Sequence, residues 1–69
     1  MSYLVVIEKA NGNYSAYVPD LPGCVATGAT RPVVRKAIRS AIAMHLAGLR
    51  QDGMPLPKPK ATSEVVDVR

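Results

Sequence analysis

Short segments rich in apolar, β-branched residues occupy the first part of the chain. Tyr3–Lys9 and Tyr14–Val18 have the composition of strands, and Asn11–Asn13 between them holds residues that tolerate the positive φ of a tight turn. Pro19–Gly23 then interrupts the pattern, because its two prolines lack a backbone donor and Gly23 can form a left-handed turn. Cys24–Gly28 resumes as a third short strand. The pattern predicts three strands joined by tight turns.

A long amphipathic helix is predicted over Arg31–Asp52. Thr30 can serve as its N-cap, Pro32 lies in the first turn where a missing N–H does no harm, and Gly53 with Pro55 ends it. At 100° per residue one face is apolar and the opposite face is polar or small. The apolar face consists of Val34, Ala37, Ile38, Ala41, Ile42, His45 and Leu49, flanked by Met44 and Leu46.

The last part of the chain is predicted to be extended. Met54–Lys60 has a proline at every other position from Pro55 to Pro59, which prevents a regular hydrogen-bonded ladder. Glu64–Val68 is short and β-branched, and is predicted to form a fourth strand that joins the sheet or a neighbouring subunit. Without repeats or a low-complexity tail, residues 1–69 are expected to form a single α+β domain of order β-β-β-α-β.

Composition makes the predicted core thin. The 69 residues are 48% hydrophobic but include no Phe or Trp and only three Tyr. A chain of this length buries only about 60% of the surface that it exposes when unfolded, so a homodimer or homotetramer is expected. No apolar segment approaches the roughly 20 residues that span a bilayer, and none resembles the core of a signal peptide, so a cytoplasmic location is expected.

Charge is concentrated at the start of the predicted helix. The net charge is +4, and Arg31, Arg35, Lys36 and Arg39 lie in its first three turns. Cations at a helix N-terminus oppose the helix dipole, which suggests contact with an acidic or nucleic-acid partner. A solvated cationic face is the commoner alternative, and the helix lacks the aromatic residues that nucleic-acid readers often place among their cations.

Two residues able to perform chemistry are predicted to be structural. Cys24 is the only cysteine, so neither an intrachain disulfide nor a site of several thiolates can form, and a buried thiol is favoured over a nucleophile. His45 lies on the apolar helix face with no Asp, Glu or Cys three or four residues away, which favours a packed, hydrogen-bonded histidine over a metal ligand.

The carboxylates form no obvious catalytic set. Asp20 is expected to accept backbone N–H groups within its own turn, and Glu8 is expected to be a solvated strand residue. A metal-dependent nuclease using Glu8, Asp20 and His45 is the least favoured hypothesis, because such chemistry needs more carboxylates. Gly12, Gly23 and Gly28 match no nucleotide-binding spacing. The residues therefore predict an interaction domain with no cofactor, no metal and no enzymatic activity.

Several motifs in this order resemble the HicB-like antitoxin family. They cover about residues 3 to 60 and comprise Tyr14, Tyr17, the turn Pro19-Asp20-Leu21-Pro22-Gly23-Cys24, Thr27-Gly28, Thr30, the helical Ala37-Ile38, Ala41-Ile42 and His45–Leu49, and the closing Asp52–Pro57. The turn joined to this helix ending is specific.

The resemblance implies a partial ribonuclease-H-like fold and a role in neutralising a HicA-type toxin that cleaves messenger RNA. Family members usually carry a C-terminal module that binds operator DNA, and none is expected within residues 1–69. Family helices are often acidic at their start, whereas this one is basic and would meet a basic toxin unfavourably. The leading hypothesis is a non-catalytic oligomeric antitoxin, and the alternative is a basic nucleic-acid-binding oligomer without a toxin partner.

Overall fold

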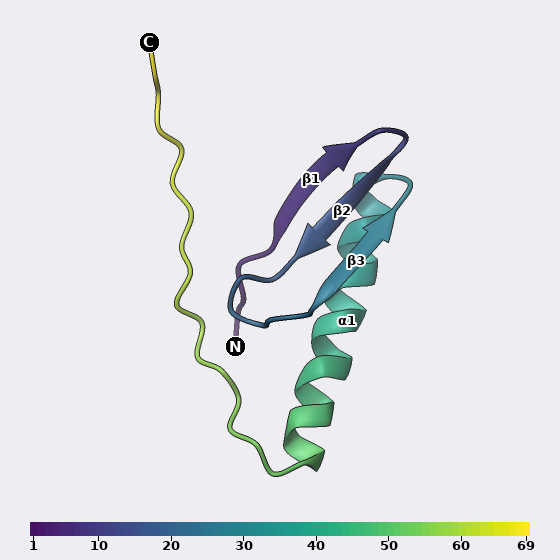
Figure 1. Cartoon of the computed structure of the whole chain (residues 1–69), viewed down its shortest axis with the longest axis vertical. Coiled ribbons are helices and arrows are strands. Elements are labelled where there is room, and N and C mark those ends of the chain that lie inside the picture. The colour runs from purple at the N-terminus through teal and green to yellow at the C-terminus, as the bar shows by residue number, and fades with distance from the viewer.

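Three strands are followed by one helix in the computed structural model, which describes residues 1–69. The strands are β1 (Val6–Ala10), β2 (Asn13–Tyr17) and β3 (Val25–Gly28), and the helix is α1 (Arg31–Gln51) (Figure 1). The predicted α+β class and the β-β-β-α order are confirmed. The predicted helix is one residue too long, since Asp52 is its C-cap.

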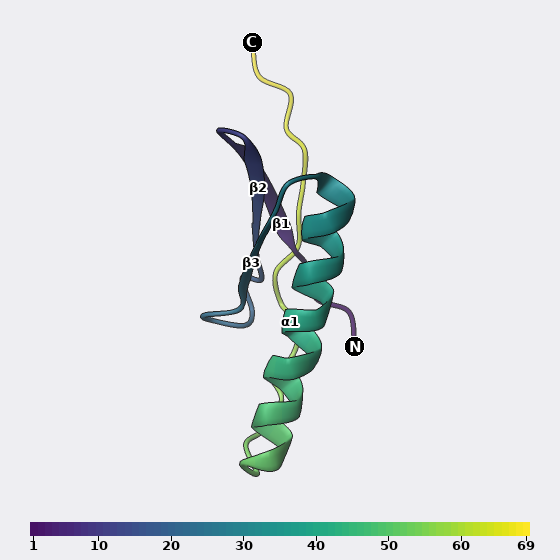
Figure 2. The ribbon, with the colours of Figure 1, turned by 90° about the vertical axis from the view of Figure 1, so that its right-hand side faces the viewer.

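The strands form one antiparallel sheet in the order β1-β2-β3. The register pairs Ile7 with Ala16 and Ala16 with Ala26, which places these apolar side chains on the same face of the sheet. The β1–β2 turn contains Gly12 at φ 78°, a conformation that favours glycine, as the predicted hairpin requires. Figure 2 shows α1 on one face of the sheet and no element on the other.

β1 starts later than predicted, at Val6 instead of Tyr3. Val6 pairs with Tyr17, the last residue of β2, and Pro19 follows two residues later. A strand cannot continue past the end of its only partner, so residues 3–5 have no ladder to join. They are half-buried nevertheless, and Tyr3 and Val5 pack against the core.

Both helix ends are capped by local sequence. Thr30 has extended φ and ψ, and its Oγ1 accepts a hydrogen bond from the Val33 N–H at 3.3 Å, as predicted for an N-cap. At the other end the Met54 N–H reaches the Leu49 carbonyl at 2.9 Å, which satisfies a carbonyl that the helix leaves free. This helix lacks the combination of length and apolarity needed to cross a membrane.

The core is small and comes from three parts of the chain. Only six of 69 residues are buried, and they form one cluster: Ala16, Val18, Leu21, Cys24, Val34 and Ile38. Val34 and Ile38 are the predicted apolar face of α1, whereas Met44 on its flank is exposed. Burying a Val, Leu or Ile side chain contributes about 1.5–3 kcal/mol to stability. A core of six residues therefore gives the folded state limited stability.

Half of this core comes from the turn after β2. Val18, Leu21 and Cys24 are all buried, and the Val18 N–H donates to the Cys24 carbonyl at 3.2 Å while the Cys24 N–H donates to the Leu21 carbonyl at 3.0 Å. Gly23 has φ 82°, the left-handed conformation that the sequence predicts there. The turn is therefore folded inward around Leu21 as part of the core.

β3 and α1 approach each other closely at Gly28. A Cβ atom at this position would lie 2.6 Å from the backbone nitrogen of Val34 and 2.9 Å from its Cα. Since backbone atoms in a helix cannot move aside freely, only glycine fits here. This contact sets the distance between the end of the sheet and the start of the helix.

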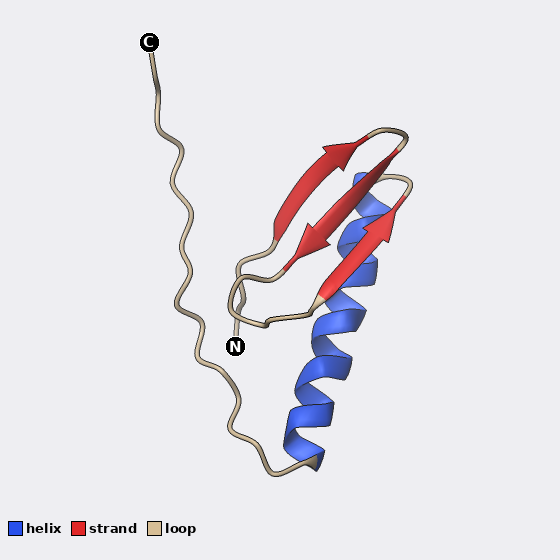
Figure 3. Cartoon of the chain, in the orientation of Figure 1, coloured by secondary structure: helices blue, strands red, loops and turns tan.

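The fourth strand predicted at Glu64–Val68 does not join the sheet of its own chain. Figure 3 shows an extended loop after α1, and residues 64–68 belong to no strand. Two tethers hold the earlier part of this loop. The Tyr3 hydroxyl donates to the Pro57 carbonyl, and Asp20 Oδ2 accepts the N–H groups of Lys60 at 2.9 Å and Ala61 at 3.0 Å.

Asp20 therefore accepts backbone N–H groups, as predicted, but from a segment 40 residues away and not from its own turn. The N–H groups of Ala61 and Lys60 hold the pKa of this carboxyl below its usual range, and the charge of Lys60 adds to the effect. A carboxylate whose pKa is lowered in the folded state stabilises that state above the pKa it has when unfolded, about 3.9. The tether is lost as the pH falls through the lowered value.

Gly28→Ala is expected to lower the free energy of unfolding by about 1–3 kcal/mol, because its methyl group would meet the backbone of α1. Gly48→Ala is the matched control: nothing lies within 4 Å of its added Cβ in the exposed helix, so it should raise stability by up to about 1 kcal/mol. Urea unfolding of both variants at equal chain concentration measures the two effects. Equal changes in the free energy of unfolding for the two variants would contradict the close approach of Gly28 to the backbone of α1.

Acid titration should release residues 60–61 while the sheet stays folded. The amide proton shifts of Lys60 and Ala61, followed by NMR from pH 6 downward, are expected to change with a midpoint below about 3.9, the usual pKa of an aspartate. The Cys24 amide, bonded to the Leu21 carbonyl, is the internal control and should not follow this step. Asp20→Asn should abolish the step, and a midpoint above 3.9 would disprove the tether.

Candidate partner-binding surfaces

The residues of the family turn divide between the core and the surface. Leu21 and Cys24 are buried, Tyr14 and Asp20 are half-buried, and the remaining members, Tyr17, Pro19, Pro22 and Gly23, are exposed. The buried members hold the turn in place, and Asp20 ties it to the C-terminal segment. Only the exposed members are free to meet a partner.

The sheet face opposite α1 carries an apolar row. Val6 pairs with Tyr17 and Tyr17 pairs with Val25, so these three side chains lie side by side across all three strands. Val6 is half-buried, whereas Tyr17 is 42% exposed and Val25 is 64% exposed. Apolar side chains gathered in this way on an uncovered face are typical of a protein interaction site. We call these three residues the outer-face row.

The predicted basic cluster lies along an open groove between α1 and the start of the chain. Arg31, Arg35, Lys36 and Arg39 are all exposed and all line this groove, whose volume is about 1130 Å³. Its remaining walls are Ser2, Tyr3, Ile7 and Pro32. The structure thus brings the four predicted cations together on one surface. We call it the basic groove.

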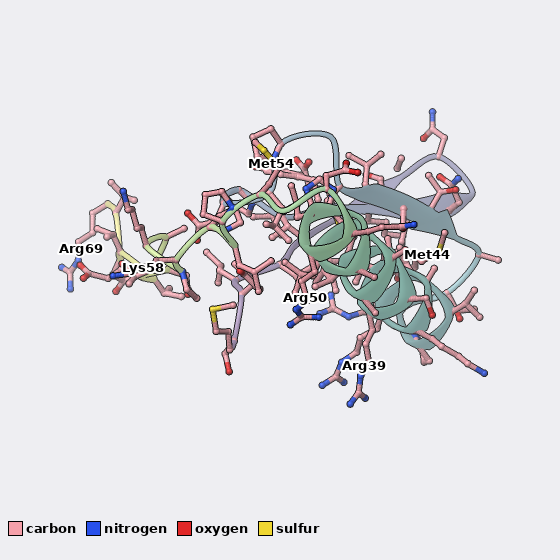
Figure 4. All side chains as sticks on the ribbon, turned by 90° about the horizontal axis from the view of Figure 1, so that it is seen from below. Arg39, Met44, Arg50, Met54, Lys58 and Arg69 are labelled. Atoms are coloured by element: carbon pink, nitrogen blue, oxygen red, sulfur yellow. The ribbon has the colours of Figure 1, made fainter.

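No acidic side chain on α1 offsets these cations. The helix contains Arg50 in addition to the four cations and no Asp or Glu, and its first turn holds no acidic residue. Figure 4 shows Arg39 and Arg50 projecting from the helix to the same side. Positions eleven residues apart nearly coincide on a helix of 3.6 residues per turn, so the cationic character extends along this side of α1.

Cys24 is buried as the sequence predicts, and His45 is half-buried. Cys24 is buried, and desolvation raises the pKa of its thiol, which keeps it protonated and unreactive. His45 is half-buried on α1, so its packing stays a prediction. The predicted hydrogen bond to His45 is not among those that the structure contains.

Glu8, Asp20 and His45 do not form a site. Glu8 pairs with Ser15 in the sheet, Asp20 binds the C-terminal segment, and His45 lies on α1. The structure contains no group of three His, Cys, Asp or Glu side chains able to hold a metal ion. This arrangement offers no support for the nuclease hypothesis.

Sequence reasoning found the cations but missed the groove. The other side of the groove comes from Tyr3 and Ile7, which precede the cluster by more than 20 residues. Ile7 lies on the same face of the sheet as Ala16, the face that α1 covers. The alternation of side chains along the strand was the available signal for this placement. Nothing local indicates that α1 leaves this part of the sheet uncovered.

Known proteins resemble this chain over nearly its whole length. A sequence profile of the family described as "HicB_like antitoxin of bacterial toxin-antitoxin system" matches residues 3–68. A chain of the solved "HicA3 and HicB3 toxin-antitoxin complex" superposes with a TM-score of 0.72 at 35% identity, covering 86% of this chain and 70% of that one.

Similar sequences differ in total length. A 14.9 kDa protein from the rep-hol intergenic region of Haemophilus phage HP1 is 34% identical over 67 residues, 97% of this chain but half of the phage protein. A UPF0150 protein of Thermoplasma acidophilum is 34% identical over 62 residues, which cover 90% of that protein. A UPF0150 protein of Helicobacter pylori is 40% identical over 47 residues, which cover 65% of that protein. The profile match, the shared fold and the family turn lead to one conclusion: the chain belongs to the HicB-like antitoxin family.

Proposed function

We propose that this protein is an antitoxin that binds a HicA-type toxin and keeps it inactive, as a non-catalytic oligomer. The observation that carries the proposal is the 35% identity and shared fold with a chain of a solved toxin-antitoxin complex. Membership of the antitoxin family over residues 3–68 supports the same role. A neutralising role needs a binding surface and no catalytic group, and the scattered positions of Glu8, Asp20 and His45 are consistent with that.

The outer-face row is the surface that best fits the toxin. A toxin that cleaves messenger RNA must attract a polyanion, so its active surface is expected to be basic. The basic groove would repel such a surface. The outer-face row is apolar, lies away from α1, and has the carboxylate of Glu8 in the neighbouring row of side chains. The exposed Pro19 and Pro22 of the family turn extend from the end of the same strand β2.

Co-expression tests this role. The small open reading frame beside the gene is expected to arrest bacterial growth, and co-expression of this protein is expected to restore it. Val25→Glu should abolish the rescue, because it buries an unpaired carboxylate in the apolar contact. The two proteins should also co-purify, and Val25→Glu should prevent it.

Met44→Glu is the matched control. Met44 is another exposed apolar residue, but it lies on α1, away from the outer-face row, so the variant should rescue growth as the original protein does. The antitoxin proposal fails if the neighbouring gene encodes no toxin that the protein rescues. Equal rescue by both variants would refute the assignment of the outer-face row alone.

One observation favours a second candidate function, a basic nucleic-acid-binding protein without a toxin partner. Four exposed cations line a single groove. If they bind phosphates, labelled RNA or DNA should bind at low salt, and affinity should fall steeply with salt, with a logarithmic slope of about −0.7 to −0.9 per neutralised phosphate. Arg35→Glu/Arg39→Glu should abolish this binding. Absence of a fluorescence anisotropy change at low salt would end this candidate.

A further inference from the structure

The last eight residues, Thr62–Arg69, extend away from the rest of the protein. We call them the C-terminal arm. All are exposed, and Val65, Val66 and Val68 are 100%, 68% and 87% exposed. Their sequence is β-branched and apolar, which favours a strand, yet they pair with nothing in their own chain (Figure 3). Exposed valines in such a segment are typical of a surface that is covered by a partner.

The tethers at Tyr3 and Asp20 direct the arm away from its own sheet. They hold residues 57, 60 and 61 beside the start of β1 and the family turn, and the arm continues from there into solvent (Figures 1 and 2). The radius of gyration of 13.5 Å exceeds the roughly 11 Å expected of a compact chain of this length. The arm is thus presented outward, in an extended conformation suited to pairing.

The free edge of β1 and the basic groove form a complementary receiving surface. β1 is an edge strand, since β2 is its only neighbour in the sheet, so its outer N–H and C=O groups can pair with another strand. Ile7 of β1 and Tyr3 contribute apolar surface to the groove beside that edge, and the cations of α1 form its opposite wall. A strand added here would lie between apolar and cationic side chains.

The arm has the matching chemistry. Glu64 and Asp67 are two of the five acidic residues of the chain, and four of the nine basic residues line the groove. In an extended strand Glu64, Val66 and Val68 share one side, which combines a carboxylate with two apolar groups. Nucleic acid would engage the cations but would leave the β1 edge and the three exposed valines unpaired.

We propose that the arm of one copy adds as a fourth strand to β1 of a second copy, with Val66 and Val68 over Ile7 and the Glu64 carboxylate against the cations of the basic groove. Reciprocal exchange of two arms closes a two-fold dimer, because each copy offers one arm and one groove. The fourth strand predicted from the sequence then forms between chains. This dimer forms at the edge of β1 and the basic groove, and it does not depend on toxin binding at the outer face of the sheet.

A charge exchange tests the proposal. The unaltered chain should sediment as a dimer of twice 7.4 kDa, and Val65–Val68 amides should be protected from hydrogen exchange. Glu64→Lys and, separately, Arg35→Glu/Arg39→Glu should each raise the dimer dissociation constant about tenfold or more, since each variant places like charges together at both copies of the contact. An equimolar mixture of the two should dimerise again with protected arms, because both contacts are then between opposite charges.

Arg50→Glu is the matched control: it reverses a charge on α1 outside the groove and should leave dimerisation unchanged. Four results would overturn the proposal. They are a monomer at every concentration, a dimer that survives both reversals, a mixture that stays monomeric, and arm protection in a monomer, which would mean that the arm pairs with its own β1. RNA binding that requires Arg35 and Arg39 without any dimer would assign the groove to nucleic acid instead.

Discussion

Packing of the Val18–Cys24 turn against α1 is the contact on which the rest of the structure depends. The core has six buried residues, and three of them, Val18, Leu21 and Cys24, come from this one turn. The strands contribute one buried residue, Ala16, to this cluster, with the partly buried Ile7, Tyr14 and Ala26 packed against it. Leu21 is completely buried in the same cluster as Ala16, Val34 and Ile38, so the turn supplies the large side chain on which the sheet and the helix pack. The chemistry of the turn, two prolines and a left-handed glycine, therefore serves first to place one leucine.

A single helix leaves part of a three-stranded sheet uncovered, and this determines where partners can bind. A helix is about 10 Å across with its side chains, whereas strands lie about 4.8 Å apart, so one helix covers about two strands. α1 packs on β3 and β2, brought close by Gly28, and β1 is left beside the basic groove. The opposite face of the sheet has no cover, which exposes Tyr17 and Val25. Both candidate surfaces follow from the position of the helix.

The sequence predicted those features that depend on neighbours in the chain. The hairpin at Gly12, the cap at Thr30, the apolar face of α1 and the left-handed Gly23 are all set by local geometry, and all are present. Contacts across the chain were not predictable in the same way. The sequence predicted that Asp20 closes its own turn. The two backbone N–H groups that it binds instead lie about 40 residues later, and the sequence does not determine the path of that proline-rich segment.

The fourth strand is the instructive difference between sequence and structure. Composition predicts a strand at Glu64–Val68 without naming its partner, since β propensity reflects the surface on which a strand packs. Within one chain that surface is absent, so the arm stays extended and its valines stay in water. The charges divide in the same manner, with cations on α1 and carboxylates on the arm. Segments that match each other in pairing groups, apolarity and charge, yet stay apart in one chain, have the properties of the two halves of an interface between chains.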